Sequence, residues 1–454
     1  MIDEKIDLKR VSDKLSGAIK IKTISNEDEA LTDWNEFDRF HSYLREQFPL
    51  IHKNLTLEVV GRAGLLYYWK GSDESLDPIA FLAHQDVVPV AAGTDEDWEH
   101  PAFEGYNDGK IIWGRGAIDM KNHLISVMES VELLLEEGFV PKRGVYICLG
   151  YNEEIVAGKD NSARMIAKVL KDKGVHLDSI VDEGGAMVPV KIPGVVDTVL
   201  SGIGIGEKGY ADFKVTVNSK GGHSSAPPKH TGLGVLSKKI RNLENHQFPS
   251  EMPDYFLKLI QAIGDKSAFW LKPILKNVDK YKGLVTFIMS NSAAGASFVR
   301  SCQAVTMASG SPTANVLPQK ASCVINFRMF RGLTIEDCRR HVEKYMGGKD
   351  VTVELLKGKE ASEISPMDSR AFETLSKLIV ENNPKSAVTP FMIVGGTDSY
   401  NYECVCENIY RFAPFEVPAN IMLTAHSTNE RIPVEQLGRG VAFFKRYIRE
   451  MTAE

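Results

Sequence analysis

Histidine and acidic residues follow short apolar runs at several separate places in this sequence. The first run, 78–83, leads into His84 and Asp86. Residues two apart on an extended chain point the same way, so both side chains face one site. A metal-binding histidine commonly donates its other ring N–H to a carboxylate, and Asp86 is placed to accept it. For so short a motif, a core histidine at a strand end is an equally good interpretation.

Four further motifs also contain acidic or histidine residues that could bind a metal ion. Asp119 comes just before the amphipathic stretch 120–137, where it could instead be a helix N-cap. Glu153 and Glu154 follow the apolar run 145–149, and adjacent carboxylates at the end of a buried strand repel each other unless cations are present. The other two motifs are Asp182 and Glu183 after the run 178–181, and His426 near the C-terminus.

Together these motifs supply two histidines and at least three carboxylates. Histidine and carboxylate ligands without cysteine are typical of a catalytic zinc or cobalt site with open positions. Two metal ions bridged by one carboxylate, about 3.5–4 Å apart, activate water and stabilise both oxygens of a tetrahedral intermediate. Of two neighbouring glutamates, one can bind metal while the other acts as a base.

Strands alternating with helices must bring these motifs together. The runs 78–83, 145–149 and 178–181 alternate with helical patterns at 120–137 and 161–172. This predicts an α/β domain whose central sheet is mixed, largely parallel and flanked by helices. In such sheets functional residues collect at the carboxyl ends of the strands.

The pattern changes near residue 209. The stretch 210–217 alternates, with Phe213, Val215 and Val217 on one face, as in a half-buried strand. The order strand, helix, strand, strand, helix, strand follows, which predicts an inserted α+β (ferredoxin-like) lid. We expect a discontinuous catalytic domain at 1–208 and 357–454, and a lid or dimerisation domain at 209–356 with an enlarged helical insertion near 248–296.

Composition excludes several classes of protein. A chain of 454 residues is long enough for two domains, and a net charge of -6 argues against nucleic-acid binding. No apolar run is long enough to span a membrane, and the charged N-terminus does not resemble a secretory signal. The six cysteines form no CxxC pair, so we expect reduced thiols and a cytoplasmic protein. The GxGxxG match at 204–209 precedes a strand rather than a helix, so no dinucleotide site is expected.

The ordered motifs resemble those of a known family. The sequence contains HQDVVPV, WEHPAF, GRGAIDMK, NEE, DEGG, GGHSS, NVLP, GGTDS and HSTNERI, in that order and over nearly the whole chain. This set resembles the zinc metallopeptidase family that contains aminoacylase, carboxypeptidase S, glutamate carboxypeptidase, ArgE and DapE. The DEGG and TNERI forms are closest to the carboxypeptidase S and aminoacylase branch.

The resemblance implies roles for individual residues. Asp119 would bridge two zinc ions, with cobalt or manganese as alternatives, and Glu153 would be the general base. Asp86 would orient His84, and either Glu183 or Asp182 would be the DEGG ligand. The metal ligands implied are His84, Asp119, Glu154, Glu183 and His426.

The resemblance also implies roles for residues in and near the lid. His223 would stabilise the oxyanion, in some family members across a dimer, although from the residues alone it is better explained as a loop residue that caps a helix. Arg328 and Asn315 would hold a substrate carboxylate, since a guanidinium matches a carboxylate bidentately. Gly396 and Thr397 would line the substrate, whereas Asp398 could equally be a turn residue.

The implied reaction is hydrolysis of the amide bond of peptides or N-acyl amino acids with a free α-carboxylate, by a hydroxide bridging two zinc ions. The substrate would be a small peptide or acyl amino acid, and neither nucleic acid nor membrane is expected as a partner. The lid sheet favours a homodimer, but so enlarged a lid could be self-sufficient. The alternatives are a biosynthetic deacylase resembling ArgE or DapE, and a non-catalytic paralogue that binds metal or peptide.

Overall fold

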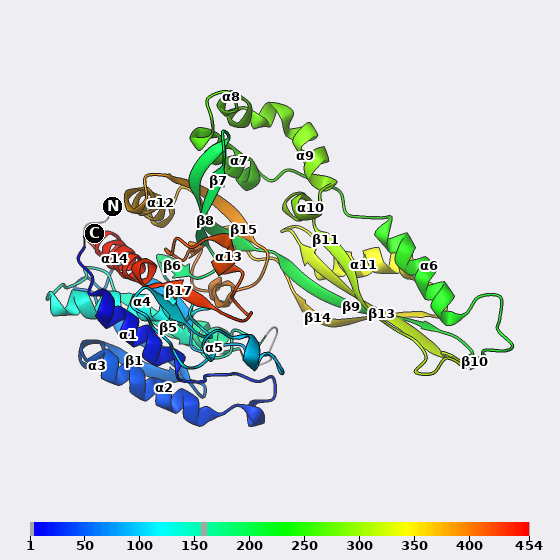
Figure 1. Ribbon diagram of the computed structural model, residues 1–454, viewed down its shortest axis with the longest axis horizontal. Helices are drawn as coiled ribbons and strands as arrows, with labels where there is room; N and C mark the ends of the chain where they lie inside the picture. Colours follow the sequence, from blue (N-terminus) through cyan, green and yellow to red (C-terminus); the bar gives the residue numbers. More distant parts are fainter. Residues whose placement is uncertain (1–3, 156–160, 454) are drawn as a thin grey trace. The chain divides into compact units, whose positions relative to one another are not determined.

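The computed structural model describes residues 4–155 and 161–453. The chain forms two compact units (Figure 1). The first comprises 1–206, 258–276 and 364–454, and the second comprises 207–257 and 277–363. Each unit is considered by itself.

A large mixed sheet forms the centre of the first unit. Its strands run in the order β1-β2-β5-β3-β6-β16-β8-β15, with β7 paired to β8. The adjacent strands β5, β3, β6 and β16 pair in parallel, whereas β1–β2, β2–β5, β16–β8 and β7–β8 pair antiparallel. The strands are β1 (Thr56–Val60), β2 (Gly64–Trp69), β3 (Ile79–His84), β5 (Val145–Gly150), β6 (Ser179–Asp182), β7 (Ala186–Ile192), β8 (Val196–Glu207), β15 (Ser386–Ile393) and β16 (Ile409–Arg411).

The central strands are buried on both faces. Every residue of β3, β5 and β6 is buried, which is why these strands appear in the sequence as continuous apolar runs rather than alternating ones. The predicted mixed sheet flanked by helices is confirmed, with parallel pairings among β5, β3, β6 and β16 and antiparallel pairings on either side of them. A second, two-stranded ladder joins β4 (Ile111–Trp113) to β17 (Arg431–Pro433), so the loop before Asp119 lies beside the chain after His426.

Helices cover the large sheet. Those of the first unit are α1 (Leu8–Ile19), α2 (Trp34–Gln47), α3 (Pro49–Asn54), α4 (Lys121–Glu136), α5 (Ser162–Asp172), α8 (Lys272–Lys276), α12 (Arg370–Asn382), α13 (Ala419–Met422) and α14 (Val434–Met451), with 3-10 turns η1 (Glu29–Leu31), η2 (Asp95–Asp97) and η4 (Asp398–Tyr402). The helix α7 (Asp254–Lys266) crosses the sequence boundary between the two units.

The helix α4 is far more buried than an amphipathic pattern suggests, because α1, α3, α14 and β3 all pack against it. From the amphipathic pattern of 120–137 alone, His123 is predicted to lie on the solvated face of the helix, and the structure shows that this prediction is wrong. His123 is 1% exposed, its ring lies 4.9 Å from that of Phe444, and burial lowers its pKa to about 3. It is a neutral core histidine.

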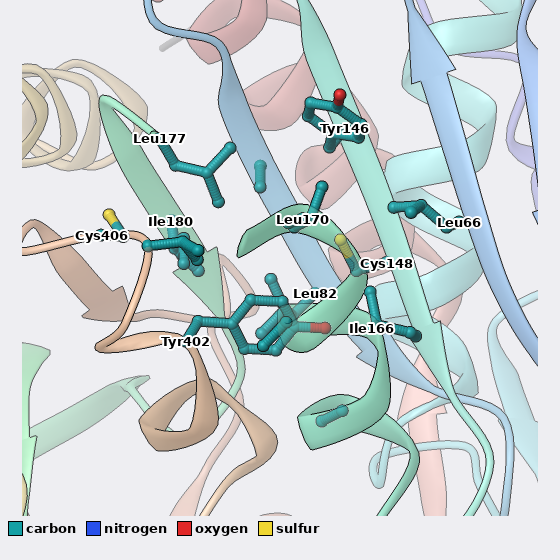
Figure 2. Close-up of a cluster of buried hydrophobic side chains, with 14 of the residues drawn as sticks. Leu66, Leu82, Tyr146, Cys148, Ile166, Leu170, Leu177, Ile180, Tyr402 and Cys406 are labelled. Carbon is teal, nitrogen blue, oxygen red and sulfur yellow. The ribbon is translucent and has the colours of Figure 1, made fainter. Parts of the chain in front are cut away.

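The helix α5 covers another part of the sheet through a large apolar cluster. Ile166 and Leu170 of this helix pack against Leu82 and Cys148 on neighbouring strands, and Tyr402 of η4 completes the cluster (Figure 2). Asn161 caps the helix by accepting the backbone N–H of Arg164. This packing fixes the chain that follows β5, which carries Glu153 and Glu154.

The second unit is built on a four-stranded antiparallel sheet in the order β11-β13-β9-β14. Phe213, Val215 and Val217 share the buried face of β9, as predicted, and α6 and α11 pack over that face (Figure 1). The inserted α+β (ferredoxin-like) fold is thus confirmed. The elements are β9 (Gly209–Asn218), β10 (Gly222–His223), α6 (Gly232–Glu244), η3 (Val278–Tyr281), α9 (Lys282–Ser290), α10 (Ala293–Val299), β11 (Cys302–Ser309), β12 (Val316–Leu317), β13 (Lys320–Met329), α11 (Ile335–Met346) and β14 (Val351–Lys359).

The state of the cysteines and the length and polarity of the helices can also be compared with the sequence analysis. All six cysteines are free thiols. Within the described residues, each helix is too short or too polar to cross a lipid bilayer.

Candidate metal centre

His84 ends β3 and is 1% exposed. Its Nδ1 lies 2.9 Å from the backbone oxygen of Asp86 and 3.4 Å from the carboxylate Oδ1 of the same residue. Because a carbonyl oxygen only accepts, Nδ1 carries a proton there. The other nitrogen, Nε2, lies 3.1 Å from Asp119 Oδ1 and 3.3 Å from Glu183 Oε1. The ring therefore directs Nε2 into a group of carboxylates.

Asp119 lies between two imidazoles. Its Oδ1 is 3.1 Å from Nε2 of His84, and its Oδ2 is 3.0 Å from Nε2 of His426. The residue stands just before α4, so its position depends on how that helix packs. One carboxylate that offers a separate oxygen to each histidine has the arrangement expected of a ligand bridging two cations.

His426 and Glu154 complete the other side of this arrangement. Nε2 of His426 lies 3.1 Å from both carboxylate oxygens of Glu154. His426 has a positive φ of 58°, a backbone conformation that costs a non-glycine residue free energy. Strain of this kind clusters at functional sites, where surrounding structure maintains it.

The ligand atoms form two overlapping groups. In one, atoms of His84, Asp119 and Glu154 lie within 4.8 Å of one another; in the other, atoms of His84, Glu153 and Glu183 do. The donors are imidazole nitrogens and carboxylate oxygens, which suit zinc, cobalt or manganese. The residues present thus fit a site for divalent cations.

The electrostatics of the cluster are unfavourable without added positive charge. Burial, and then the Asp119 carboxylate, raise the pKa of Glu183 to about 8. Burial likewise raises the pKa of Glu153 well above its usual value; His84 partly offsets this, and Glu183, Asp398 and Glu154 add to it. Hydrogen bonds to Asp119 and Glu154 raise the pKa of His426 to about 10. Divalent cations would relieve the repulsion among these carboxylates.

Asp86 connects three parts of the cluster. It is fully buried, contacts His84, and accepts the backbone N–H groups of Glu153 and Glu154, one on each carboxylate oxygen at 3.2 Å. The same side chain therefore orients the histidine and fixes the turn that presents both glutamates. This is the kind of outer contact that orients metal ligands.

The two acids of the DEGG motif point to different partners. Asp182 accepts the backbone N–H of Glu183 at 2.9 Å and that of Ser399 at 3.0 Å. Glu183 instead directs its carboxylate to His84. The geometry therefore favours Glu183 over Asp182 as the residue that faces a cation.

Glu430 has a structural role that the sequence analysis did not assign. It is fully buried, and its Oε1 accepts the backbone N–H groups of Gly116, Ile118 and Asp119 at 3.0, 2.8 and 3.1 Å. Its Oε2 accepts Nη1 of Arg115 at 2.7 Å. Glu430 thus holds the loop that carries Asp119. The sequence feature that could have identified Glu430 is its place in the TNERI motif, four residues after His426.

Asp398 is not an ordinary turn residue. It begins η4, is 6% exposed, and accepts Nδ2 of Asn161 at 3.2 Å. Burial and the nearby Asp182 raise its pKa to about 7. A Cβ atom at Gly150 would lie 2.4 Å from its Oδ2, so a larger residue at position 150 would displace this carboxylate. Thr397 caps η4 and is buried, whereas Gly396 is exposed.

The second unit brings together some of the other predicted residues. His223 lies on β10, which pairs with β12, and Ser224 donates its backbone N–H to the carbonyl oxygen of Asn315. Nδ1 of His223 is 2.7 Å from Oγ of Ser225. Arg328 lies at the far end of β13, opposite Tyr210, with its guanidinium 4.8 Å from that ring. Asn315 and Arg328 are therefore not neighbours within this unit.

Comparisons with known proteins agree with this architecture. The profile of peptidase family M20/M25/M40 matches residues 80–450. Carboxypeptidase S of Saccharomyces cerevisiae is 33% identical over 488 residues, covering 96% of this chain and 83% of that protein. N-fatty-acyl-amino acid synthase/hydrolase PM20D1 of Bos taurus is 31% identical over 448 residues, covering 96% and 87%. A solved M20 family metallo-carboxypeptidase, Sso-CP2 from Sulfolobus solfataricus, has a TM-score of 0.70 at 17% identity, covering 99% of this chain and 100% of that one.

Replacement of Glu430 tests whether its hydrogen bonds keep the loop that carries Asp119 in place. We expect Glu430→Gln to weaken zinc affinity by about 10–100-fold, because the contacts that orient a metal ligand are lost or weakened. Affinity is measured by competition with a chelator, and circular dichroism checks the fold. Glu435→Gln on the exposed start of α14 is the matched control. Equal zinc affinity in the two variants would contradict this role for Glu430.

Zinc binding should release protons at neutral pH. Because the folded pKa of His426, about 10, exceeds its ordinary 6.5, the protonated ring stabilises the metal-free protein below about pH 6.5, and this contribution is lost as pH rises towards 10. Zinc requires the neutral ring, so binding at pH 7 displaces its proton. Calorimetry in two buffers of different ionisation enthalpy measures the release. Equal binding enthalpies in both buffers would rule it out.

Proposed function

Because the chain belongs to peptidase family M20/M25/M40 and is a metallo-hydrolase, we propose that it cleaves an amide bond next to a free α-carboxylate with two bound zinc ions. The substrates would be small peptides or N-acyl amino acids. One observation carries the proposal: Asp119 offers a separate carboxylate oxygen to each of two histidines, beside the half-buried Glu153.

The proposed ligand sets follow the contacts around Asp119. His84 and Glu183 would hold one ion, and Glu154 and His426 the other, with Asp119 shared. Divalent cations held by these residues would lower the pKa of a bound water and would polarise the scissile carbonyl. Asp86 and Glu430 keep the ligands in place before substrate arrives.

Glu153 is proposed as the general base. Its carboxylate is close to His84 and Glu183, and its backbone is fixed by Asp86. Burial and neighbouring carboxylates raise its pKa, which makes it a stronger base than a solvated glutamate. We propose that it takes the proton of the attacking water and delivers it to the leaving nitrogen.

The substrate carboxylate needs a cationic partner, which we propose is Arg328. Its guanidinium can bind a carboxylate bidentately. Asn315 and His223 lie at the opposite end of the lid sheet from Arg328, so we propose that they reach the substrate of the partner subunit in a homodimer, where Asn315 would hydrogen-bond the substrate and His223 would stabilise the oxyanion. Gly396 and Thr397 are proposed to line the substrate. The names of the relatives, a carboxypeptidase and an N-fatty-acyl-amino acid synthase/hydrolase, support a substrate with a free α-carboxylate.

A panel of dipeptides and N-acyl amino acids, each paired with its carboxyl-amidated analogue, tests the proposed substrate class. With zinc, cobalt or manganese added, we expect hydrolysis of at least one substrate that carries a free carboxylate. For its carboxyl-amidated analogue we expect kcat/KM to be lower by about 10²-fold or more, because the cationic group that binds the carboxylate would be left without a partner. Equal rates for the acid and its amide would reject recognition of the carboxylate. Preference for a single biosynthetic acyl amino acid would favour the deacylase alternative.

Substitution of Glu153 tests the base. We expect Glu153→Gln to lower kcat by about 10²–10⁴-fold, because it removes the proton acceptor while preserving size. Metal analysis of the purified variant should show the wild-type zinc content. Glu407→Gln, at an exposed position, is the control. Near wild-type turnover with zinc bound would remove Glu153 from the reaction.

A further inference from the structure

Four polar side chains form a cluster on one face of the sheet in the second unit. Because side chains alternate across a strand, Tyr210 and Asp212 of β9 point away from α6 and α11, which pack over Phe213 on the opposite face. On the neighbouring strand β13, Arg328 lies opposite Tyr210 and Asn326 lies opposite Asp212. All four polar residues are half-buried. The cluster lies entirely within the second unit.

Hydrogen bonds hold the ring of Tyr210 in place. Its hydroxyl donates to Oδ2 of Asp212, and Nδ2 of Asn326 donates to Oδ1 of the same carboxylate at 2.9 Å. Burial, and then the hydrogen bond to Asp212, raise the pKa of Tyr210 to about 12, so the hydroxyl remains a donor at neutral pH. Asp212 thus connects the ring to the paired strand β13 and restricts its rotation.

The ring in turn restricts the guanidinium of Arg328. The guanidinium carbon Cζ of Arg328 lies 4.8 Å from the ring centroid of Tyr210, within the distance at which an aromatic face attracts a cation. The ring covers a face of the guanidinium, whereas the N–H donors lie in the guanidinium plane and point outward from its edge. The contact therefore orders the side chain without using the donors that would bind a carboxylate.

We propose that Tyr210 is a positioning residue for substrate recognition, because its ring holds the guanidinium of Arg328 in the orientation that binds the substrate carboxylate. This rests on the function proposed above for Arg328 and deepens it. A long side chain that is already ordered loses less conformational freedom when it binds its ligand. Tyr210 thereby contributes to the selectivity for substrates with a free carboxylate, and it acts through Arg328 rather than on the scissile amide.

The substrate that is hydrolysed best in the panel, together with its carboxyl-amidated analogue, provides the test. The readout is the ratio of kcat/KM for the acid to kcat/KM for the amide. We expect Tyr210→Leu to raise KM for the acid by about 3–30-fold and to leave the amide nearly unchanged, because only the acid uses the ordered guanidinium. Tyr210→Phe keeps the ring and should retain most of the ratio. A merely structural role would lower the rates for acid and amide alike.

A double-mutant cycle tests whether Tyr210 acts through Arg328. In the Arg328→Ala background, Tyr210→Leu should cause no further loss of the ratio, because the side chain that it positions is gone. Asp212→Asn, which removes one of the two carboxylate acceptors, should lower the ratio by a smaller factor. Lys214→Gln, on the same face of β9, is the matched control and should keep the wild-type ratio. Circular dichroism checks that each variant is folded.

The outcomes separate this inference from the function on which it rests. If the wild type hydrolyses no acid, or if Arg328→Ala keeps the wild-type ratio, the proposed carboxylate site is wrong and the inference fails with it. If Arg328→Ala lowers the ratio but the folded Tyr210 and Asp212 variants keep it, the inference alone is wrong. An equal loss from Tyr210→Leu with and without Arg328 would also overturn the inference, since Tyr210 would then act independently.

Discussion

The repulsion among buried carboxylates is the constraint on which the metal centre depends. Asp119, Glu153, Glu154 and Glu183 lie together around two imidazoles, and burial makes each negative charge costly. In the metal-free protein, the cluster responds by holding protons: the pKa of Glu183 is raised to about 8 and that of His426 to about 10. The same repulsion that opposes ionisation would favour the binding of divalent cations, and so the cost of assembling the cluster is linked to the chemistry proposed for it.

The fold meets this constraint by placing ligands on rigid parts of the chain and fixing them with further carboxylates. His84 and the two glutamates follow β3 and β5, neighbouring parallel strands whose ends meet at one edge of the sheet. Asp86 accepts the N–H groups of the glutamate turn, and Glu430 accepts those of the Asp119 loop. Both accept backbone donors, so they hold geometry rather than react. The positive φ of His426 shows that packing, and not local preference, sets the position of this candidate ligand.

Much of the fold could be predicted because its signals are local. The continuous apolar runs of β3 and β5 and the alternation of β9 each report burial within a few residues. The prediction for His123 was wrong, and the role of Asp398 stayed open, because burial at both positions depends on distant partners. His123 is in the core because α14 packs over α4, and Asp398 is buried because η4 packs against α5 and β3. Periodicity within one helix or turn contains no information about those neighbours.

The sequence by itself determined the chemistry that is available: histidines and carboxylates without a cysteine cluster, at strand ends, in an order that resembles one metallopeptidase family. Only the tertiary structure decided which atoms meet. In the folded protein Glu183 contacts His84, and Asp182 accepts the backbone N–H of Ser399. The two oxygens of Asp119 contact two histidines that are far apart in the chain. The physical reason is that residue type and strand period are properties of a few consecutive residues. Hydrogen bonds across hundreds of residues depend instead on how whole strands and helices pack.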